Sequence, residues 1–185
     1  MFSLYICNMI QEEFKFYKPC KLLQPYVRYY WVFSSNQMLK TYTFPIGCSQ
    51  IIFHKRTPLY VPELDTTQHK LTISGQVNFS SHLQADDDIE MIVVVFYPHT
   101  INLFLDTPAS SFYNKEVSGY DIEDKHLVEL AKQVFECEDN NHCVNLIERW
   151  LLSRLSIRPY ETTYRVRRML AAIEQLCAAP QTLVT

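Results

Sequence analysis

The chain has 185 residues, 48% of them hydrophobic, and a net charge of −3, which excludes a disordered chain and allows one domain or slightly more. Its three glycines, Gly47, Gly75 and Gly119, are far apart, so a glycine-rich phosphate loop and a dinucleotide fold are excluded. Residues 149–185 hold six arginines against two glutamates, whereas the chain before them is acidic. Only the basic end could attract nucleic acid, and a solvated helix face is the simpler explanation of its arginines.

The six cysteines and the N-terminus indicate the cellular compartment. The cysteines show no CxxC spacing and no dense framework, so we expect reduced thiols in a cytoplasmic protein. Residues 1–10 are apolar, but they lack a basic start and meet Glu12 and Glu13 at once. This stretch is too short to span a membrane and is a poor signal peptide. We expect an edge strand or a loose leader there, and no membrane partner.

The first half of the chain has the character of β-strands. Residues 26–33 are aromatic or β-branched on both faces, and a proline-glycine turn precedes a strand over 48–54. A short piece is expected at 59–61, and 71–80 alternates with Gly75 as a bulge. The most hydrophobic run, 90–97, is typical of a central strand. Several short strands separated by turns predict an antiparallel barrel or sandwich.

From residue 98 the pattern changes to helical spacing. A short helix is predicted over 98–105, then one over 122–136 capped by Asp121, and another from Asp139 or Asn140 to Ser156. The apolar face of this last helix covers about half of its circumference, with Arg154 in the middle. A final amphipathic helix is predicted over 164–177. The fold class is therefore α+β.

The residue types that carry chemistry form no recognisable site. The six histidines show no HxH or HExxH spacing, so we expect no metal and no cofactor. Three consecutive aspartates, 86–88, indicate a solvated loop tip rather than a cation site. No GxSxG motif occurs, and Cys137 and Cys143 flank His142 without an orienting acid. We therefore expect that the protein is not an enzyme.

A small barrel either fills with side chains or encloses one small ligand. We expect a mostly apolar cavity lined by aromatic residues of the strands, with two polar contacts; a plainly packed core is the alternative. The proposed ligand-binding residues are Tyr30, Trp31, Phe53 and Phe79, with His54 and Gln76 as the polar contacts.

Several short segments resemble the effector-sensing half of AraC-type bacterial transcription regulators, in the branch with a divergent cupin-like domain. They are residues 23–31 (LQPYVRYYW), 44–48 (FPIGC) running into 51–53 (IIF), 73–76 (ISGQ), and 94–98 (VVFYP) followed by a short helix. The two helices after residue 121 match as well. Residues 167–176 (RRMLAAIEQL), followed by 182–185 (TLVT), look like the opening of the family's DNA-binding half.

The resemblance implies a cupin-like barrel at 1–107, a helical dimerisation segment at 108–158, and a linker with the start of the helix-turn-helix domain at 159–185. It implies a regulator that binds a small-molecule effector, with DNA read only by a C-terminal domain mostly absent here. No helix-turn-helix is complete, so no recognition helix is named. The alternatives are a cupin-like enzyme, a stand-alone ligand-binding protein, or a purely structural interaction module with a solid barrel.

We also expect a homodimer built on the helix from Asn140 to Ser156, because its apolar face is wider than one contact surface needs. The alternative is that the helix over 164–177 folds back onto this face within one chain. The expected interface residues are Ile147, Trp150, Leu151, Leu152 and Leu155.

Overall fold

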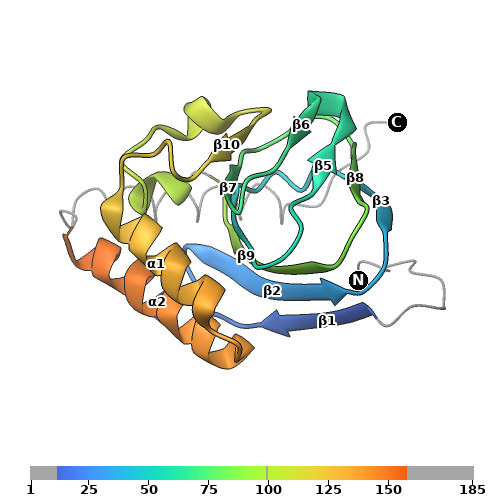
Figure 1. Cartoon of the computed structure of the whole chain (residues 1–185). Coiled ribbons are helices and arrows are strands. Elements are labelled where there is room, and N and C mark those ends of the chain that lie inside the picture. Colours follow the sequence, from blue (N-terminus) through green and yellow to red (C-terminus); the bar gives the residue numbers. More distant parts are fainter. Residues whose placement is uncertain (1–11, 99, 158–185) are drawn as a thin grey trace, which may run out of the picture.

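The computed structural model describes residues 12–98 and 100–157. Two antiparallel sheets curve around a common interior, and two helices cover the outer face of the larger sheet (Figure 1). The larger sheet has six strands in the order β1-β2-β9-β4-β7-β10, and the smaller has four in the order β3-β8-β5-β6. The predicted α+β class, with a cupin-like sandwich followed by helices, is confirmed.

The larger sheet consists of β1 (Glu12–Tyr17), β2 (Val27–Ser35), β4 (Gln50–His54), β7 (Leu71–Ser74), β9 (Ile89–Phe96) and β10 (Glu116–Ser118). The smaller sheet consists of β3 (Leu39–Thr43), β5 (Tyr60–Val61), β6 (Thr66–Thr67) and β8 (Ser81–Ala85). The helices are α1 (Lys125–Glu136) and α2 (Asn140–Ile157), with 3₁₀ turns η1 (Pro62–Leu64), η2 (Ile101–Leu103) and η3 (Ala109–Phe112).

The larger sheet is buried on both faces, and each face has its own core. Successive side chains of a strand point to opposite faces. In β9, Val94 and Phe96 pack in the core beneath the helices, whereas Val93 and Val95 pack in the core between the two sheets. This double burial explains why β9 reads as an unbroken hydrophobic run. We call the space between the sheets the barrel interior.

The helix caps differ in part from the prediction. The carboxylate of Asp124, not that of Asp121, accepts hydrogen bonds from the backbone N–H groups of His126 and Leu127, at 3.0 and 3.1 Å. Residue 121 lies in a turn, three residues before the true cap. Asp139 accepts a hydrogen bond from the backbone N–H of His142 at 3.0 Å, as expected of a cap for α2.

The segment 71–80 is not one strand with a bulge. Strand β7 ends at Ser74, and β8 begins only at Ser81. Gly75 lies so close to the backbone of η3 that an added Cβ would be 1.6 Å from the carbonyl oxygen of Phe112. The glycine therefore allows the chain to pass against another backbone segment, and the alternation beyond it belongs to a loop.

The barrel and helices are joined more closely than the predicted division at residue 107 implies. Strand β10 lies after that division and pairs with β7 in the larger sheet. One hydrophobic core contains residues of β2, β4, β9, α1 and α2, so the helices and this sheet fold against each other. The predictions for residues 1–10, His99 and residues 159–185, including the helix over 164–177, lie outside the described residues.

Candidate functional site

The structure divides the six predicted ligand-binding residues among different places. Tyr30 and Phe53 lie in the core beneath the helices, on the face opposite the barrel interior. Tyr30 and Trp31 are neighbours on β2, as Phe53 and His54 are on β4. Only one member of each pair can therefore point to the interior. Tyr30 and Phe53, which the sequence predicts as ligand contacts, therefore face the helices in this structure.

Of the other three predicted contacts, Trp31 packs against the interior core, and Gln76 and Phe79 lie in the loop after β7. Trp31 is half-buried at the edge of the interior, where it stacks on Phe14 with ring centroids 5.2 Å apart. Gln76 lies in the loop after β7, where its side-chain amide donates to the carbonyl of Gly47 at 2.5 Å. Phe79 is half-buried in the same loop. Of the six predicted ligand-binding residues, His54 is the one that is both fully buried and on the interior side.

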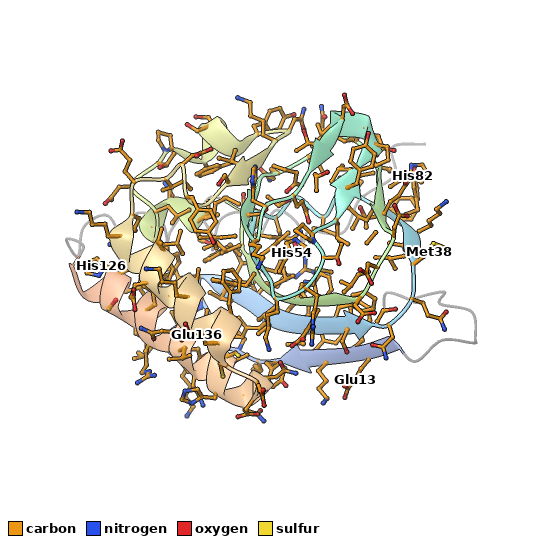
Figure 2. The ribbon with its side chains drawn as sticks, in the orientation of Figure 1. Glu13, Met38, His54, His82, His126 and Glu136 are labelled. Carbon is orange, nitrogen blue, oxygen red and sulfur yellow. The ribbon has the colours of Figure 1, made fainter. Side chains whose placement is uncertain are left out.

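His54 begins a chain of polar side chains inside the barrel. Its Nε2 lies 2.8 Å from Oε1 of Gln68, and Nε2 of Gln68 donates to Oε2 of Glu116 at 3.1 Å. The hydroxyl of Ser74 donates to the other carboxyl oxygen of Glu116 at 2.9 Å. We call these four residues the interior relay. Figure 2 shows His54 within the ring of strands.

Strand register places the interior relay on the interior face. His54 pairs with Met91, which belongs to the interior core, and directly paired residues share a face. Ser74 pairs with both Gln50 and Glu116, and Gln50 pairs with Val95 of the same core. Thus β4, β7 and β10 carry three members of the relay, and the segment between β6 and β7 carries Gln68.

Burial controls the charge of the two titratable members. Burial lowers the pKa of His54 to about 4, against the hydrogen bond to Gln68, so the imidazole is neutral at physiological pH. Burial raises the pKa of Glu116 to about 7, although hydrogen bonds from Ser74 and Gln68 favour its charged form. The relay therefore holds a neutral imidazole and a carboxyl group that titrates near neutrality.

One atom of the relay has no partner. The Nδ1 atom of His54 is buried and forms no hydrogen bond within the part of the chain that the structure describes. An unpaired buried polar atom is costly, and such atoms in folded proteins call for a partner. The core on the same side of the sheet is apolar and includes Phe33, Leu39, Ile52, Leu59, Met91, Val93 and Val95. The interior therefore combines an apolar core with one polar atom that lacks a partner among the described residues.

Sequence reasoning found His54 but missed Gln68 and Glu116. They lie 14 and 48 residues from their relay partners along the chain, and Gln68 belongs to neither a predicted strand nor a motif. Only the pairing of β10 with β7 brings Glu116 to the interior. No local signal in the sequence marks either residue.

The expected dimer residues are largely used inside one chain. Ile147, Trp150 and Leu151 are buried in the core beneath the helices, and Leu152 and Leu155 are half-buried against it. Intrachain packing therefore accounts for the width of the apolar face of α2. A groove of about 510 Å³ runs between α1 and α2. Its lining residues include Glu129, Leu130, Leu146, Arg149 and Trp150.

Burial keeps the side chain of Cys143 in the helical segment as a thiol. Burial raises the pKa of Cys143 to about 12, and its Sγ atom lies 3.5 Å from the carbonyl oxygen of Cys137. A thiol of this kind is a poor nucleophile at neutral pH. Within residues 12–98 and 100–157, no three potential metal ligands among His, Cys, Asp and Glu lie together.

The fold and the interior relay define a cupin-like α+β domain with a polar site buried between its two sheets. The chain belongs to the family described as "Domain of unknown function (DUF6597)", which matches residues 15–118, more than half of its length. This match spans the strands from β2 to β10 and all four residues of the relay. No curated protein and no solved structure matches the chain. In the described residues, neither helix has the length and apolar character of a membrane span.

Proposed function

We propose that the chain is the effector-sensing region of an AraC-type transcription regulator, which binds a small molecule at the interior relay. The observation that carries the proposal is the buried Nδ1 atom of His54, which has no hydrogen-bond partner among the described residues and lies beside the apolar core between the sheets. A ligand that bonds this atom would satisfy it and gain apolar contacts at the same time. The resemblance of residues 23–31, 44–53, 73–76 and 94–98 to such regulators supports the same reading.

The helices offer a route from the interior to a neighbouring domain. Tyr30 of β2 lies beside Glu148 of α2, whose carboxylate also accepts a hydrogen bond from the backbone N–H of Cys20 at 2.8 Å. Phe53 of β4, the neighbour of His54, contacts Phe135 of α1 with ring centroids 6.5 Å apart. A change in the position of β4 would therefore act on α1 directly. In the proposal, this movement alters how a C-terminal helix-turn-helix domain meets DNA.

The homodimer that we propose uses the groove between α1 and α2 rather than the buried residues of α2. Glu129 and Arg149 line this groove on opposite helices and are both exposed. A two-fold axis would set each against the opposite charge of the partner. Trp150 also lines the groove, and its indole N–H lacks a hydrogen-bond partner among the described residues.

Sedimentation equilibrium with charge reversals tests this dimer. Arg149→Glu should weaken self-association by about tenfold, and adding Glu129→Arg should restore it. Lys40→Glu, at an exposed position of β3 outside the lining of the groove, is the matched control. A protein that stays monomeric at high concentration, or a dimer unaffected by Arg149→Glu, would contradict the interface.

The regulator itself is tested by the coding sequence after Thr185 and by DNA binding. A following domain of about a hundred residues with two helix-turn-helix patterns is expected. The protein containing that domain should bind DNA specifically, and a metabolite that binds the barrel should change its affinity. A coding sequence that ends at Thr185 would favour the second candidate, a stand-alone ligand-binding protein, because the interior relay would remain without a DNA-binding partner.

A further inference from the structure

The interior relay is connected through one amide, and an amide has two different ends. The carbonyl oxygen of Gln68 faces His54 at 2.8 Å, and its NH₂ group faces Glu116 at 3.1 Å. The exposed fractions of His54 and Gln68 are 0% and 5%, so water does not freely replace the bond between these two side chains. Each end of the amide must therefore face a group of the opposite hydrogen-bonding character.

With Glu116 ionised, the direction of every bond in the relay is fixed. A carboxylate only accepts, so the NH₂ group of Gln68 points to it and the carbonyl of Gln68 points to His54. The carbonyl requires a donor, and Nε2 of His54 must carry the proton. A neutral imidazole has one N–H, so Nδ1 then presents its lone pair.

Protonation of Glu116 reverses this order. A carboxylic acid O–H facing Gln68 needs an acceptor, so the amide turns by half a rotation and presents its carbonyl to Glu116. The NH₂ group then points to His54, whose Nε2 must accept, and the imidazole proton resides on Nδ1. Overall the relay takes up one proton, at Glu116. The imidazole loses a proton at Nε2 and gains one at Nδ1, and so remains neutral.

We propose that Gln68 and Glu116 are specificity-determining residues that set whether His54 Nδ1 accepts or donates a hydrogen bond to the ligand. The site takes a small, mainly apolar molecule that offers a hydrogen-bond donor when Glu116 is ionised, and one that offers an acceptor when Glu116 is protonated. This ligand class rests on the proposed function, because it assumes that the ligand meets His54.

The surroundings of Glu116 favour titration of this one group. It faces Ser74 from β7 and, through Gln68, His54 from β4. The titratable side chains that adjoin Gln68 and Glu116 in the sequence, His69, Lys70 and Lys115, are exposed to solvent. The pKa of Glu116, raised by burial to about 7, and the low pKa of His54 then allow Glu116 to change charge while the imidazole stays neutral.

The first test reads the imidazole directly and needs no ligand. Long-range ¹H–¹⁵N spectra of the histidine-labelled protein report which ring nitrogen carries the proton, and ¹³C spectra report the ionisation of Glu116. Between about pH 5.5 and about pH 8.5, the two nitrogens of His54 should exchange character with the midpoint of Glu116. Gln68→Leu should leave the titration of Glu116 but hold His54 in one tautomer. Exposed His82 is the internal reference.

A fixed tautomer while Glu116 titrates would overturn the coupling, since the acid proton would then sit on the oxygen that faces Ser74. If the tautomer of His54 still changes at the midpoint of Glu116 in Gln68→Leu, the amide does not couple the two residues, and its proposed role is overturned. If Gln68→Leu fails to fold, a comparison of the midpoints of His54 and Glu116 in the wild type still decides whether the two residues are coupled.

The second test uses phenol, a donor, and acetophenone, an acceptor of similar size, as ligand probes. Phenol should be preferred at about pH 8.5 and acetophenone at about pH 5.5, with the ratio of affinities changing by about tenfold, as one hydrogen bond allows. An unchanged preference, or binding of neither probe, would overturn the ligand class. If the tautomer of His54 follows Glu116 but neither probe binds, the coupling within the relay stands, and the proposed function is contradicted together with the ligand class that rests on it.

Discussion

Arg154 of α2 forms an ion pair with Asp124, the residue that caps α1, with 2.9 Å between guanidinium nitrogen and carboxylate oxygen. The same guanidinium donates through Nε to the carbonyl of Phe104 at 2.9 Å, just after η2. Both charged side chains are largely buried, at 14% and 10% exposure. This contact explains why an arginine falls in the middle of the apolar face of α2: it joins the end of α2 to the start of α1.

Replacement of Arg154 should therefore be costly. Arg154→Ala leaves the buried carboxylate of Asp124 without its counter-charge, and should lower the free energy of unfolding by about 3 kcal/mol. Lys132→Ala, which removes an exposed pair with Glu129 at 3.8 Å, should change it by less than about 0.5 kcal/mol. Urea denaturation measures both. Equal effects of the two substitutions would show that the buried Arg154 ion pair stabilises the fold no more than the exposed Lys132 pair does.

The titrations of His54 and Glu116 act on stability with opposite signs. Below its ordinary pKa of 6.5, unfolded His54 is protonated while the folded residue stays neutral to about 4, so stability rises with pH over that range. Folded Glu116 binds its proton up to about pH 7, whereas the unfolded residue loses it at 4.5, so stability falls as pH rises between them. The two contributions nearly cancel between pH 4.5 and 6.5.

Single variants should separate these contributions. The free energy of unfolding of Glu116→Gln, minus that of the wild type, should increase as pH rises. The same difference for His54→Gln should decrease as pH rises. Each change should amount to up to about 3 kcal/mol. Denaturation curves at several pH values in the same buffer provide the measurement. Other groups titrate equally in all three proteins and cancel in the differences. Parallel pH profiles for the two variants would rule out the assigned shifts.

Two glycines offer a matched pair of substitutions. Gly75→Ala places a Cβ 1.6 Å from the carbonyl oxygen of Phe112, a backbone atom that cannot move alone, and should destabilise by about 3 kcal/mol or more. Gly47 has φ +68°, but an added Cβ would meet only the side-chain amide of Gln76 at an ordinary contact distance of 3.7 Å, so Gly47→Ala should cost only about 1 kcal/mol. Thermal unfolding ranks the two, and a reversed order would contradict the close approach of η3 to β7.

The position of Leu151 decides how the dimer is tested. Leu151 has no exposed surface, so Leu151→Glu should unfold the helical layer whatever the oligomeric state. Loss of the near-ultraviolet circular dichroism signal should accompany any loss of self-association in this variant. Leu151→Glu folding normally as a monomer would instead place this residue at the interface, as the sequence predicts.

The sequence predicted the strands best where burial is strongest. The runs that became β2 and β9 are apolar on both faces, because a core lies on each side of the larger sheet. Strand β3, with mostly exposed residues, has no such pattern and was not predicted. The cap of α1 was placed three residues early because Asp121 and Asp124 are equally good capping residues. Only the ion pair of Asp124 with Arg154 distinguishes them.

The candidate site was predicted only in part, for a related reason. Aromatic residues were grouped by type, but alternation along a strand sends Tyr30 and Trp31, or Phe53 and His54, to opposite faces. Which face encloses the interior depends on the sheet order, which pairs distant strands. Gln68 and Glu116 join His54 only through that order, and their amide and carboxyl groups resemble ordinary surface side chains in the sequence.

If the barrel interior is a ligand site, small-molecule binding must depend on His54. A metabolite library is screened by equilibrium binding against the wild type, His54→Leu and the control His82→Leu, whose histidine is exposed. We expect a ligand that binds wild type and His82→Leu alike and binds folded His54→Leu at least about tenfold more weakly. Equal binding to all three proteins, with the ligand located outside the barrel interior, would contradict it.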